Sequence, residues 1–366
     1  WFAEEAVRVN GNLVTAPSGQ YTMLTRLQPV GVSLLITPWN FPAAMATRKI
    51  GPALAAGCTT ILKPAGATPL TAFALARVFA DAGVPDGVVN VVSTNSSSAL
   101  TEPLLADPRV RKLSFTGSTE VGRTLLRQAA GQVLRTSMEL GGNAPFLVLP
   151  DADLEVAVEA AVTAKLRNIG QSCVAANRFH VHRSLVEEFA ARLAEEFAAQ
   201  RVGHGLAEGV HLGSLIDTDA RDDVLALIDD AVSRGARLVT GGEPVGERGA
   251  CLSPAVLVEV PADARCVREE IFGPVAPIVA FDDVEEAVAA ANDTIFGLVG
   301  YVVGADLQRA LSVADRLEVG MVGINRGVVS DPAAPFGGRK QSGLGREGGH
   351  EGLLEYLETK YIAVDW

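Results

Sequence analysis

The fold of this chain is decided by a short apolar stretch, Val30-Gly31-Val32-Ser33-Leu34-Leu35-Ile36, and by the helical pattern directly after it. The stretch has the length and composition of a buried strand. The same alternation of strand and helix then repeats along the chain. Strands are expected at 31–36, 59–62, 88–92 and 112–115, and helices at 43–56, at 68–82 and after Ser118. Apolar strands separated by helices predict an α/β fold with a parallel sheet that helices cover on both faces.

A second α/β run begins after Gly141-Gly142. Within it, Ser184-x-x-Glu187 indicates a capping box that opens a helix reaching about residue 200. Strands are expected at 145–149, 178–182, 299–303 and 321–325, and helices at 222–234, 284–292 and 306–317. The two ends of the chain differ from this pattern: residues 1–9 suit a helix end, 12–28 a hairpin, and 353–364 a terminal strand of the kind that often pairs with another subunit.

Composition limits the classes of function. The net charge of −12 argues against nucleic acid or an anionic membrane as a partner, and 48% hydrophobic residues indicate a well-buried globular protein. The four cysteines form no C-x-x-C pair and no zinc-ligand spacing, which predicts free thiols, no metal site and a reducing compartment, the cytoplasm. No run reaches membrane-spanning length and no signal peptide is present. Because the chain does not begin with methionine, we expect its native start to be missing.

Two residues carry a recognisable chemistry. Glu139 and Cys173 each lie in a glycine-marked break beside an apolar stretch, where a fold exposes reactive side chains. A thiol can attack a carbonyl, and a carboxylate can later take a proton from water. No histidine lies between them, so a thiol esterase is a weaker interpretation. The pair therefore favours oxidation of an aldehyde.

Short motifs around these two residues extend along the whole chain. They are Pro38-Trp39-Asn40-Phe41-Pro42, Lys63-Pro64-Ala65, Phe115-Thr116-Gly117-Ser118, Glu139-Leu140-Gly141-Gly142, Gly170-Gln171-Ser172-Cys173, Glu269-Glu270-Ile271-Phe272-Gly273-Pro274 and Pro335-Phe336-Gly337-Gly338. In their order and spacing they resemble the aldehyde dehydrogenase superfamily. Within it, Thr47-Arg48-Lys49, Lys165-x-Arg167-Asn168 and the segment 340–347 are most similar to the succinate-semialdehyde dehydrogenases.

The resemblance implies a Rossmann-type nucleotide-binding domain, an α/β catalytic domain and a small oligomerisation β-element. Since 366 residues exceed what one core usually supports, more than one domain is expected on length alone. We assign 1–28 to a helix end and oligomerisation hairpin, 29–140 to an NAD(P)-binding domain that lacks its N-terminal part, 141–345 to the catalytic domain and 346–366 to a C-terminal oligomerisation strand. A homodimer or homotetramer is the expected assembly.

The resemblance also assigns the catalytic roles. Cys173 is the nucleophile, and the Asn40 side chain and the Cys173 backbone N–H are the donors for the oxyanion that its attack creates. Such a donor is typically worth about 3 kcal/mol. Glu139 then activates the water that hydrolyses the thioester. Without the motif, a lone cysteine would be expected as a small buried hydrophobe, which is how we interpret Cys58, Cys251 and Cys266.

The cofactor, NADP or NAD, is expected at residues that the same motifs mark. They are Thr37, Pro38, Trp39, Lys63, Gly66, Gly117, Ser118, Gly122, Glu270 and Phe272. Lys63 is expected at the adenosine ribose, Glu270 and Phe272 at the nicotinamide ribose and ring, and a phosphate near the helix that comes after Ser118. Relatives that use NAD usually have a glutamate at the position of Gly66, and its absence removes the main repulsion of a 2′-phosphate. The sequence therefore predicts that NADP is accepted.

Three residues are candidates for the substrate. The resemblance implies that the carboxylate tail of a small aldehyde is bound by Arg48, Arg167 and Ser330. Arginine suits this role because its two parallel N–H donors match the two carboxylate oxygens. For Arg167 the alternative is a cation at a helix C-terminus, for Arg48 a structural ion pair, and Asp331 beside Ser330 would oppose a carboxylate. The predicted reaction is oxidation of succinate semialdehyde to succinate. Another semialdehyde such as glutarate semialdehyde, or a truncated relative without activity, are the alternatives. Ala175 excludes a local disulfide with Cys173.

Overall fold

The computed structural model describes residues 1–246 and 249–365, and it confirms the predicted α/β fold. The chain forms two compact units. Unit 1 contains residues 1–140, 330–337 and 343–366, and unit 2 contains residues 141–329 and 338–342. Residues 330–337 and 343–345, which the sequence groups with the catalytic domain, therefore pack with unit 1.

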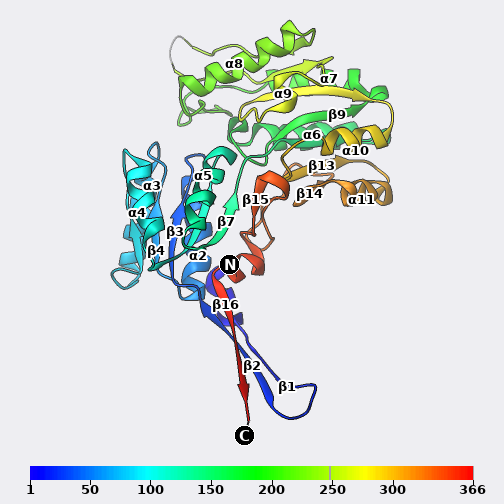
Figure 1. The fold of residues 1–366 in the computed structure, drawn as a ribbon. Helices are drawn as coiled ribbons and strands as arrows, with labels where there is room; N and C mark the ends of the chain where they lie inside the picture. The colour runs from blue at the N-terminus through cyan, green and yellow to red at the C-terminus, as the bar shows by residue number, and fades with distance from the viewer. Residues whose placement is uncertain (247–248, 366) are drawn as a thin grey trace. The chain divides into compact units, whose positions relative to one another are not determined.

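Unit 1 is built on a six-stranded sheet with the order β15-β7-β6-β3-β4-β5 (Figure 1). Its strands are β3 (Val32–Ile36), β4 (Thr60–Lys63), β5 (Val89–Val91), β6 (Val110–Thr116), β7 (Arg135–Glu139) and β15 (Gly343–Leu344). The strands expected from the sequence pair in parallel, which confirms the predicted parallel sheet, and the short strand β15, which was not predicted, adds an antiparallel edge beside β7. Gly343 allows that pairing, because a Cβ there would lie 2.0 Å from the carbonyl oxygen of Met138.

Helices cover both faces of this sheet, as the sequence predicts. On β3, Leu34 and Ile36 pack on one side with Leu125, whereas Leu35 packs on the other side with Ile50. This alternation comes from the two-residue period of a strand. The helices are α2 (Pro42–Ala56) and α3 (Pro69–Asp81) on one face and α4 (Ser97–Ala106) and α5 (Thr119–Ala130) on the other.

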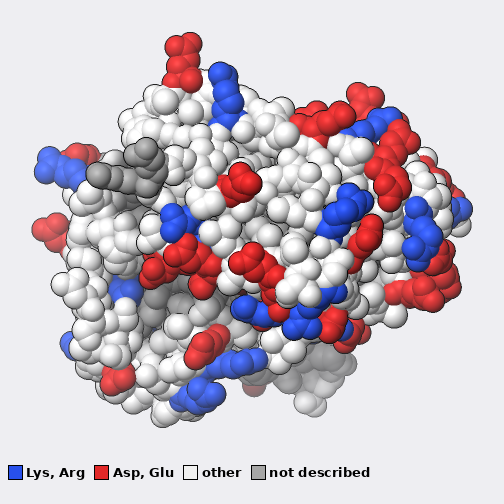
Figure 2. Space-filling model, turned by 90° about the horizontal axis from the view of Figure 1, so that it is seen from above, with Lys and Arg blue, Asp and Glu red and all other residues white. Residues whose placement is uncertain are grey.

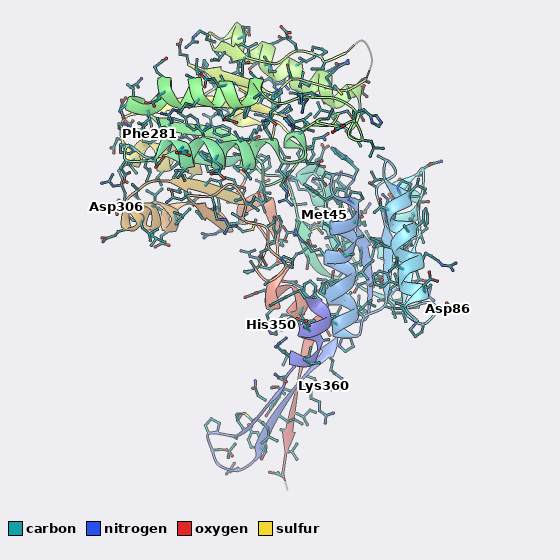
Figure 3. All side chains as sticks on the ribbon, turned by 180° about the vertical axis from the view of Figure 1, so that it is seen from behind. Met45, Asp86, Phe281, Asp306, His350 and Lys360 are labelled. Atoms are coloured by element: carbon teal, nitrogen blue, oxygen red, sulfur yellow. The ribbon has the colours of Figure 1, made fainter. Side chains whose placement is uncertain are left out.

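Unit 1 also contains the two ends of the chain. The predicted hairpin is confirmed as β1 (Asn12–Thr15) and β2 (Thr22–Pro29), which pair antiparallel. The terminal strand is β16 (Leu357–Val364), and it pairs along β2 of the same chain (Figure 1), with Lys360 on it in Figure 3. The short helical elements of this region are α1 (Phe2–Glu5), η1 (Ala6–Arg8) and α12 (Gly349–Leu354).

Unit 2 is built on a seven-stranded sheet with the order β10-β11-β12-β9-β8-β13-β14. Its strands are β8 (Ala144–Val148), β9 (Ala176–His182), β10 (Arg237–Thr240), β11 (Ala255–Val258), β12 (Val275–Phe281), β13 (Val299–Val303) and β14 (Met321–Ile324). Only β10 runs antiparallel to its neighbour among these strands. Its helical elements are α6 (Leu154–Leu166), η2 (Arg167–Gly170), η3 (Arg183–Leu185), α7 (Val186–Ala198), α8 (Thr218–Ser233), α9 (Arg265–Arg268), α10 (Val284–Asn292), α11 (Leu307–Arg316) and η4 (Lys340–Ser342).

Some elements of the fold escape the sequence patterns. The helices α4 and α6 and the strands β7, β10, β11 and β12 are absent from the predicted set. α6 buries Ala157, Ala161 and Leu166, and its exposed polar residues Glu155, Glu159 and Thr163 follow the helical period of four, so a signal for this helix was present in the sequence. The predicted capping box is also wrong, because the Ser184 hydroxyl lies 2.8 Å from Nδ1 of His182, the residue that caps η3.

The described surface carries side chains of both charges (Figure 2). The face drawn in Figure 2 carries acidic and basic side chains interspersed, without a broad basic area among its described atoms. In unit 2, Asp306 precedes α11 and Phe281 ends β12, as Figure 3 labels them. Across residues 1–246 and 249–365, no helix combines the length and the apolar composition that crossing a membrane needs.

Candidate active site

The sheet order of unit 1 places most of the expected cofactor residues together. The chain leaves β3 for β4 and β5 on one side and returns to β6 and β7 on the other. In open α/β sheets, ligands bind beyond the carboxyl ends of the strands where the order reverses. Thr37, Lys63 and Gly117 directly follow or end the adjacent strands β3, β4 and β6. Their side of the sheet is therefore the nucleotide site expected on topological grounds.

Lys63 ends β4 and is 7% exposed. Burial lowers the pKa of its ammonium, and its Nζ donates to the carbonyl oxygen of Pro64 at 3.4 Å. Three residues later, a Cβ on Gly66 would meet no heavy atom within 4 Å. The position of Gly66 therefore has room for a side chain, and steric crowding is not the reason that a carboxylate is absent there.

The expected phosphate position lies at the start of α5. Ser118 caps this helix, and its hydroxyl accepts a hydrogen bond from the N–H of Val121 at 3.4 Å. A Cβ on Gly117 would lie 2.5 Å from the ring of Phe115, and one on Gly122 would lie 2.4 Å from Leu140, so both glycines are needed for close packing. The N–H groups and dipole of the first turn suit an anion.

The segment Thr37-Pro38-Trp39-Asn40 connects β3 to α2. Thr37 is buried, and its N–H donates to the carbonyl oxygen of Lys63 at 3.2 Å, which joins this segment to the end of β4. Pro38, Trp39 and Asn40 are half-buried. The predicted oxyanion donor is thus held on the same edge of the sheet as Lys63.

Glu139 ends β7 and is 3% exposed. Its main chain is fixed, because its carbonyl oxygen accepts from the N–H of Gly117 at 3.1 Å and it pairs with Gly343. Among the described residues, neither carboxylate oxygen has a hydrogen-bond partner. Burial, and then the negative charge of Glu347, raise the pKa of Glu139 well above its usual range. A carboxylate of raised pKa is the type of group that can accept a proton from water near neutral pH.

A buried polar cluster lies beside Glu139, which the sequence reasoning missed. Lys49 of α2 is fully buried, pairs with the Glu347 carboxylate and donates to the Ser114 hydroxyl at 2.9 Å. Lys49 and Arg48 lower the pKa of Glu139 against the effect of burial. A signal was available, since Lys49 occupies an apolar-face position of α2, four residues after Met45. A charge on such a face indicates a buried partner.

In unit 2, Cys173 comes after an unusual backbone. Asn168 and Ile169 have φ values of 53° and 52°, in the left-handed region, and Gly170 has a φ of 78°. A buried β-branched residue such as Ile169 rarely adopts this conformation. Such strain persists only where the surroundings over-determine it, and it is common at functional sites. Cys173 itself is half-exposed, whereas Cys58 and Cys266 are buried.

Two further motifs pack against this loop. A Cβ on Gly142 would lie 2.4 Å from the carbonyl oxygen of Cys173, and one on Gly170 would lie 2.3 Å from that of Gly273. The Gly142 N–H donates to Oε1 of Glu270 at 3.1 Å. Unit 2 therefore brings the predicted nicotinamide residues, Glu270 and Phe272, close to the nucleophile segment.

Glu270 is a partly buried carboxylate with a perturbed pKa. Burial raises that pKa to about 7, against the Gly142 hydrogen bond and the charge of Lys165. Lys165 of α6 is fully buried, donates to Oδ1 of Asn177 at 3.2 Å, and has its pKa lowered by burial to about 7. Phe272 has a φ of 49°, a left-handed conformation that is uncommon for a bulky residue. Lys165 is a second charged residue that the sequence reasoning missed.

The predicted substrate residues are divided between the units. Arg167, in unit 2, is exposed at the C-cap of α6. This position also suits the alternative interpretation of Arg167 as a cation at a helix C-terminus. Arg48, in unit 1, lies with its guanidinium carbon 4.5 Å from the centroid of the Phe336 ring. Ser330 is half-buried in unit 1, and the neighbouring Asp331 accepts from the N–H of Ala333 at 2.8 Å. The Asp331 carboxylate is thus engaged in a local turn.

The part of the chain that the structure describes contains no group of histidine, cysteine and acidic side chains that could hold a metal ion.

Comparisons with known proteins identify relatives of the whole chain. Residues 1–362 match the model of the aldehyde dehydrogenase family. The chain is 53% identical over 364 residues to a succinate-semialdehyde dehydrogenase of Paenarthrobacter nicotinovorans, covering 100% of this chain and 81% of that protein. It is 50% identical to a glutarate-semialdehyde dehydrogenase of Pseudomonas putida, covering 100% of this chain and 75% of that protein. It superposes with a TM-score of 0.98 on a crystal structure of succinate-semialdehyde dehydrogenase from Burkholderia pseudomallei, at 49% identity, covering 100% of this chain and 75% of that one.

Proposed function

Because the chain belongs to the aldehyde dehydrogenase family and is an NAD(P)-dependent enzyme of that family, we propose that it oxidises an aldehyde with a carboxylate tail, and succinate semialdehyde in particular. The relatives named as succinate-semialdehyde dehydrogenases support the substrate class. The observation that carries it is the position of Arg167, an exposed cation at the C-cap of α6 that lies in the same unit as Cys173 and six residues before it.

Cys173 is the proposed nucleophile. Its Sγ adds to the aldehyde carbon, and the resulting oxyanion is stabilised by the Cys173 N–H and by the Asn40 side chain. A bound NAD(P) supplies the hydride acceptor that converts this adduct to a thioester. Glu270 and Phe272 would hold its nicotinamide end, since Glu270 accepts a hydrogen bond from the Gly142 N–H and Gly273, next to Phe272, lies against Gly170 of the nucleophile segment. The half-exposed thiol of Cys173 is accessible to a small aldehyde.

Glu139 is the proposed general base for thioester hydrolysis. It takes a proton from water, and the hydroxide adds to the thioester carbon and displaces the Cys173 thiolate. The raised pKa of Glu139 suits proton uptake, and its two carboxylate oxygens are buried without a hydrogen-bond partner among the described residues, so their capacity to accept a hydrogen bond is unused. The nearby Lys49 and Glu347 form a buried ion pair whose two charges act on the pKa of Glu139 in opposite directions.

NADP is the proposed preferred cofactor. Lys63 provides a cation at the end of β4, and the open space at Gly66 is where a carboxylate would repel a 2′-phosphate. Two relatives, from Sinorhizobium fredii and Escherichia coli, carry NADP(+) in their names, at 51% and 50% identity. The helix start at Ser118 would hold the cofactor phosphates.

Arg167 is the proposed principal contact for the substrate carboxylate. It is exposed at the C-cap of α6, in the same unit as Cys173 and six residues before it in the chain. A short carboxylate tail could therefore reach Arg167 while the aldehyde carbon lies at the thiol. Arg48 and Ser330 are proposed as further contacts, although the stacking of Arg48 on Phe336 also gives that arginine a structural role.

Glutarate semialdehyde is the second candidate substrate, because glutarate-semialdehyde dehydrogenases of Pseudomonas are 50% and 49% identical to this chain. We further propose that the protein forms a homodimer or homotetramer through the strands β1, β2 and β16. Its proposed location is the cytoplasm. The acidic net charge of −12 gives no support to nucleic acid or membranes as partners.

Initial rates of reduced nicotinamide formation test the function. The panel consists of succinate semialdehyde, glutarate semialdehyde and an uncharged aldehyde of matched length, each with NADP and with NAD. We expect the highest kcat/KM for succinate semialdehyde with NADP. Equal kcat/KM for the charged and uncharged aldehydes would contradict the carboxylate clamp, and absence of any turnover would favour the non-catalytic alternative.

A further inference from the structure

Tyr301 lies at the centre of unit 2, on β13, and is 1% exposed. In the sheet it pairs with Phe146 of β8 and with Gly323 of β14. Its ring packs against that of Phe146, with centroids 5.8 Å apart and the planes tilted by 34°. On the other side, a Cβ on Gly323 would lie 2.9 Å from Cδ1 of Tyr301, so the ring occupies a space that only glycine leaves open. The orientation of the ring is therefore fixed from both sides.

The hydroxyl of Tyr301 reaches the nucleophile loop. It donates to the carbonyl oxygen of Val174 at 2.7 Å, and Val174 directly follows Cys173. The bond is short and buried, so a polar hydroxyl and a backbone carbonyl satisfy each other without water. The raised pKa of Tyr301, which is caused first by burial and then by Cys173, keeps the hydroxyl proton in place.

The loop needs such an external contact. Its residues Asn168 and Ile169 have left-handed backbone conformations, which local interactions alone do not favour for these residue types. At the far end of the loop, Gly142 leaves room for the carbonyl oxygen of Cys173, and the Tyr301 hydroxyl donates to the carbonyl oxygen of Val174 from a different strand. The Val174 carbonyl group is thus bonded to a side chain of β13, outside the nucleophile segment.

We propose that Tyr301 is a positioning residue for Cys173. Its hydroxyl fixes the Val174–Ala175 peptide group, the second one after the nucleophile, and through this backbone it directs the thiol and the Cys173 N–H. The inference rests on the proposed function only in taking Cys173 as the nucleophile. Since an error of about 1 Å in the position of a reacting group can cost on the order of 100-fold in rate, one such hydrogen bond can matter for turnover.

Tyr301→Phe tests this proposal, because it removes the hydroxyl and keeps the ring. We expect alkylation of Cys173 by iodoacetamide at neutral pH, followed by peptide mass spectrometry, to slow about tenfold, the effect of one net hydrogen bond of typical strength. kcat for the best aldehyde should fall by a similar factor, whereas KM for the cofactor should stay unchanged. The alkylation does not require turnover, so it reports on Tyr301 even where no aldehyde is oxidised.

The buried thiols of Cys58 and Cys266 separate positioning from loosening of the fold. In the same experiment they should stay unreactive in Tyr301→Phe. Thr101→Val is the matched control, since it removes a buried hydroxyl that donates to the carbonyl oxygen of Ser97 within α4 of unit 1, and it should leave Cys173 alkylation unchanged. Wild-type alkylation of Cys173 in Tyr301→Phe would overturn the proposal. So would a change that appears together with labelling of Cys58 and Cys266, because the role would then be structural.

Discussion

Replacement of Lys49 by methionine should be among the most disruptive single changes in unit 1. The Lys49 side chain is fully buried, and its ammonium pairs with the Glu347 carboxylate, whose side chain is 7% exposed. Methionine fills a similar volume without charge, so the variant leaves Glu347 buried and without its cation. Breaking a buried pair in this way typically costs about 3–5 kcal/mol, of which the lost hydrogen bond to Ser114 is a smaller part of about 1 kcal/mol.

Urea unfolding followed by circular dichroism measures this loss at pH 7, and the double variant Lys49→Met with Glu347→Leu is its control. Removing both charges should restore most of the free energy of unfolding, because no buried carboxylate then remains unpaired. A double variant as unstable as the single one would refute the reasoning, since the cost would then come from packing around Lys49 rather than from the charge on Glu347.

The same variant predicts a shift in activity with pH. Lys49 lowers the pKa of Glu139, which burial and Glu347 raise. Without Lys49 that pKa should rise further, so the pH at which Glu139 becomes ionised should move upward. If Glu139 is the general base, the ascending limb of kcat against pH should move to higher pH in Lys49→Met. A limb that stays in place would show that another group controls it.

Three further predictions concern the cofactor, the substrate and the base. Gly66→Glu should reduce kcat/KM with NADP by about 10- to 100-fold and spare the rate with NAD. The reason is that the new carboxylate and the 2′-phosphate, at about 5 Å, would repel each other by roughly 1–3 kcal/mol at a protein surface. Equal losses with both cofactors would contradict this. Arg167→Ala should raise KM for succinate semialdehyde by at least about tenfold and leave an uncharged aldehyde unaffected, since a charge-assisted hydrogen bond is worth about 1.5–3 kcal/mol; equal effects on the two would exclude the clamp. Glu139→Gln should abolish turnover but raise Tm relative to wild type. The pKa of Glu139 is higher in the folded protein than in the unfolded chain, where it is about 4.3, so the wild type loses stability as the pH rises above that unfolded value. The difference in Tm between Glu139→Gln and wild type should therefore grow with pH until the folded pKa is reached. A Tm difference that does not depend on pH would refute the raised pKa of Glu139.

The strands and helices that the sequence predicts are those with a clear period or a clear boundary. The apolar stretch of β3, bounded by Gly31, and the helix α10 with its acidic first turn are examples. β12 lacks this contrast, because most of its residues are buried and all of them are apolar, whereas α6 has an exposed polar face at Glu155, Glu159 and Thr163 that could have been found. Periodicity distinguishes a buried face from an exposed one, and it carries no information where both are buried.

For the site, the sequence indicates the residues but not the interactions that tune them. The Glu139 motif predicts a base, yet its raised pKa depends on Glu347, far away in the sequence, and on Lys49. Lys165 likewise belongs to the motif Lys165-x-Arg167, but its position beside Glu270 comes only from the fold. Such coupling is a property of tertiary packing, which single-sequence patterns do not contain.

The motif glycines of unit 2 explain why the motifs are weak individually and specific together. Gly142 belongs to one motif and leaves room for the carbonyl oxygen of Cys173 in a second. Gly170 belongs to the second and leaves room for the carbonyl oxygen of Gly273 in a third. Each glycine is therefore required by the backbone of another motif rather than by its own turn alone, although Gly170 also has a positive φ. Because the contacts are between backbones, a substitution at any of these glycines should displace the neighbouring motif, and the order and spacing of the motifs carry information that no single one holds.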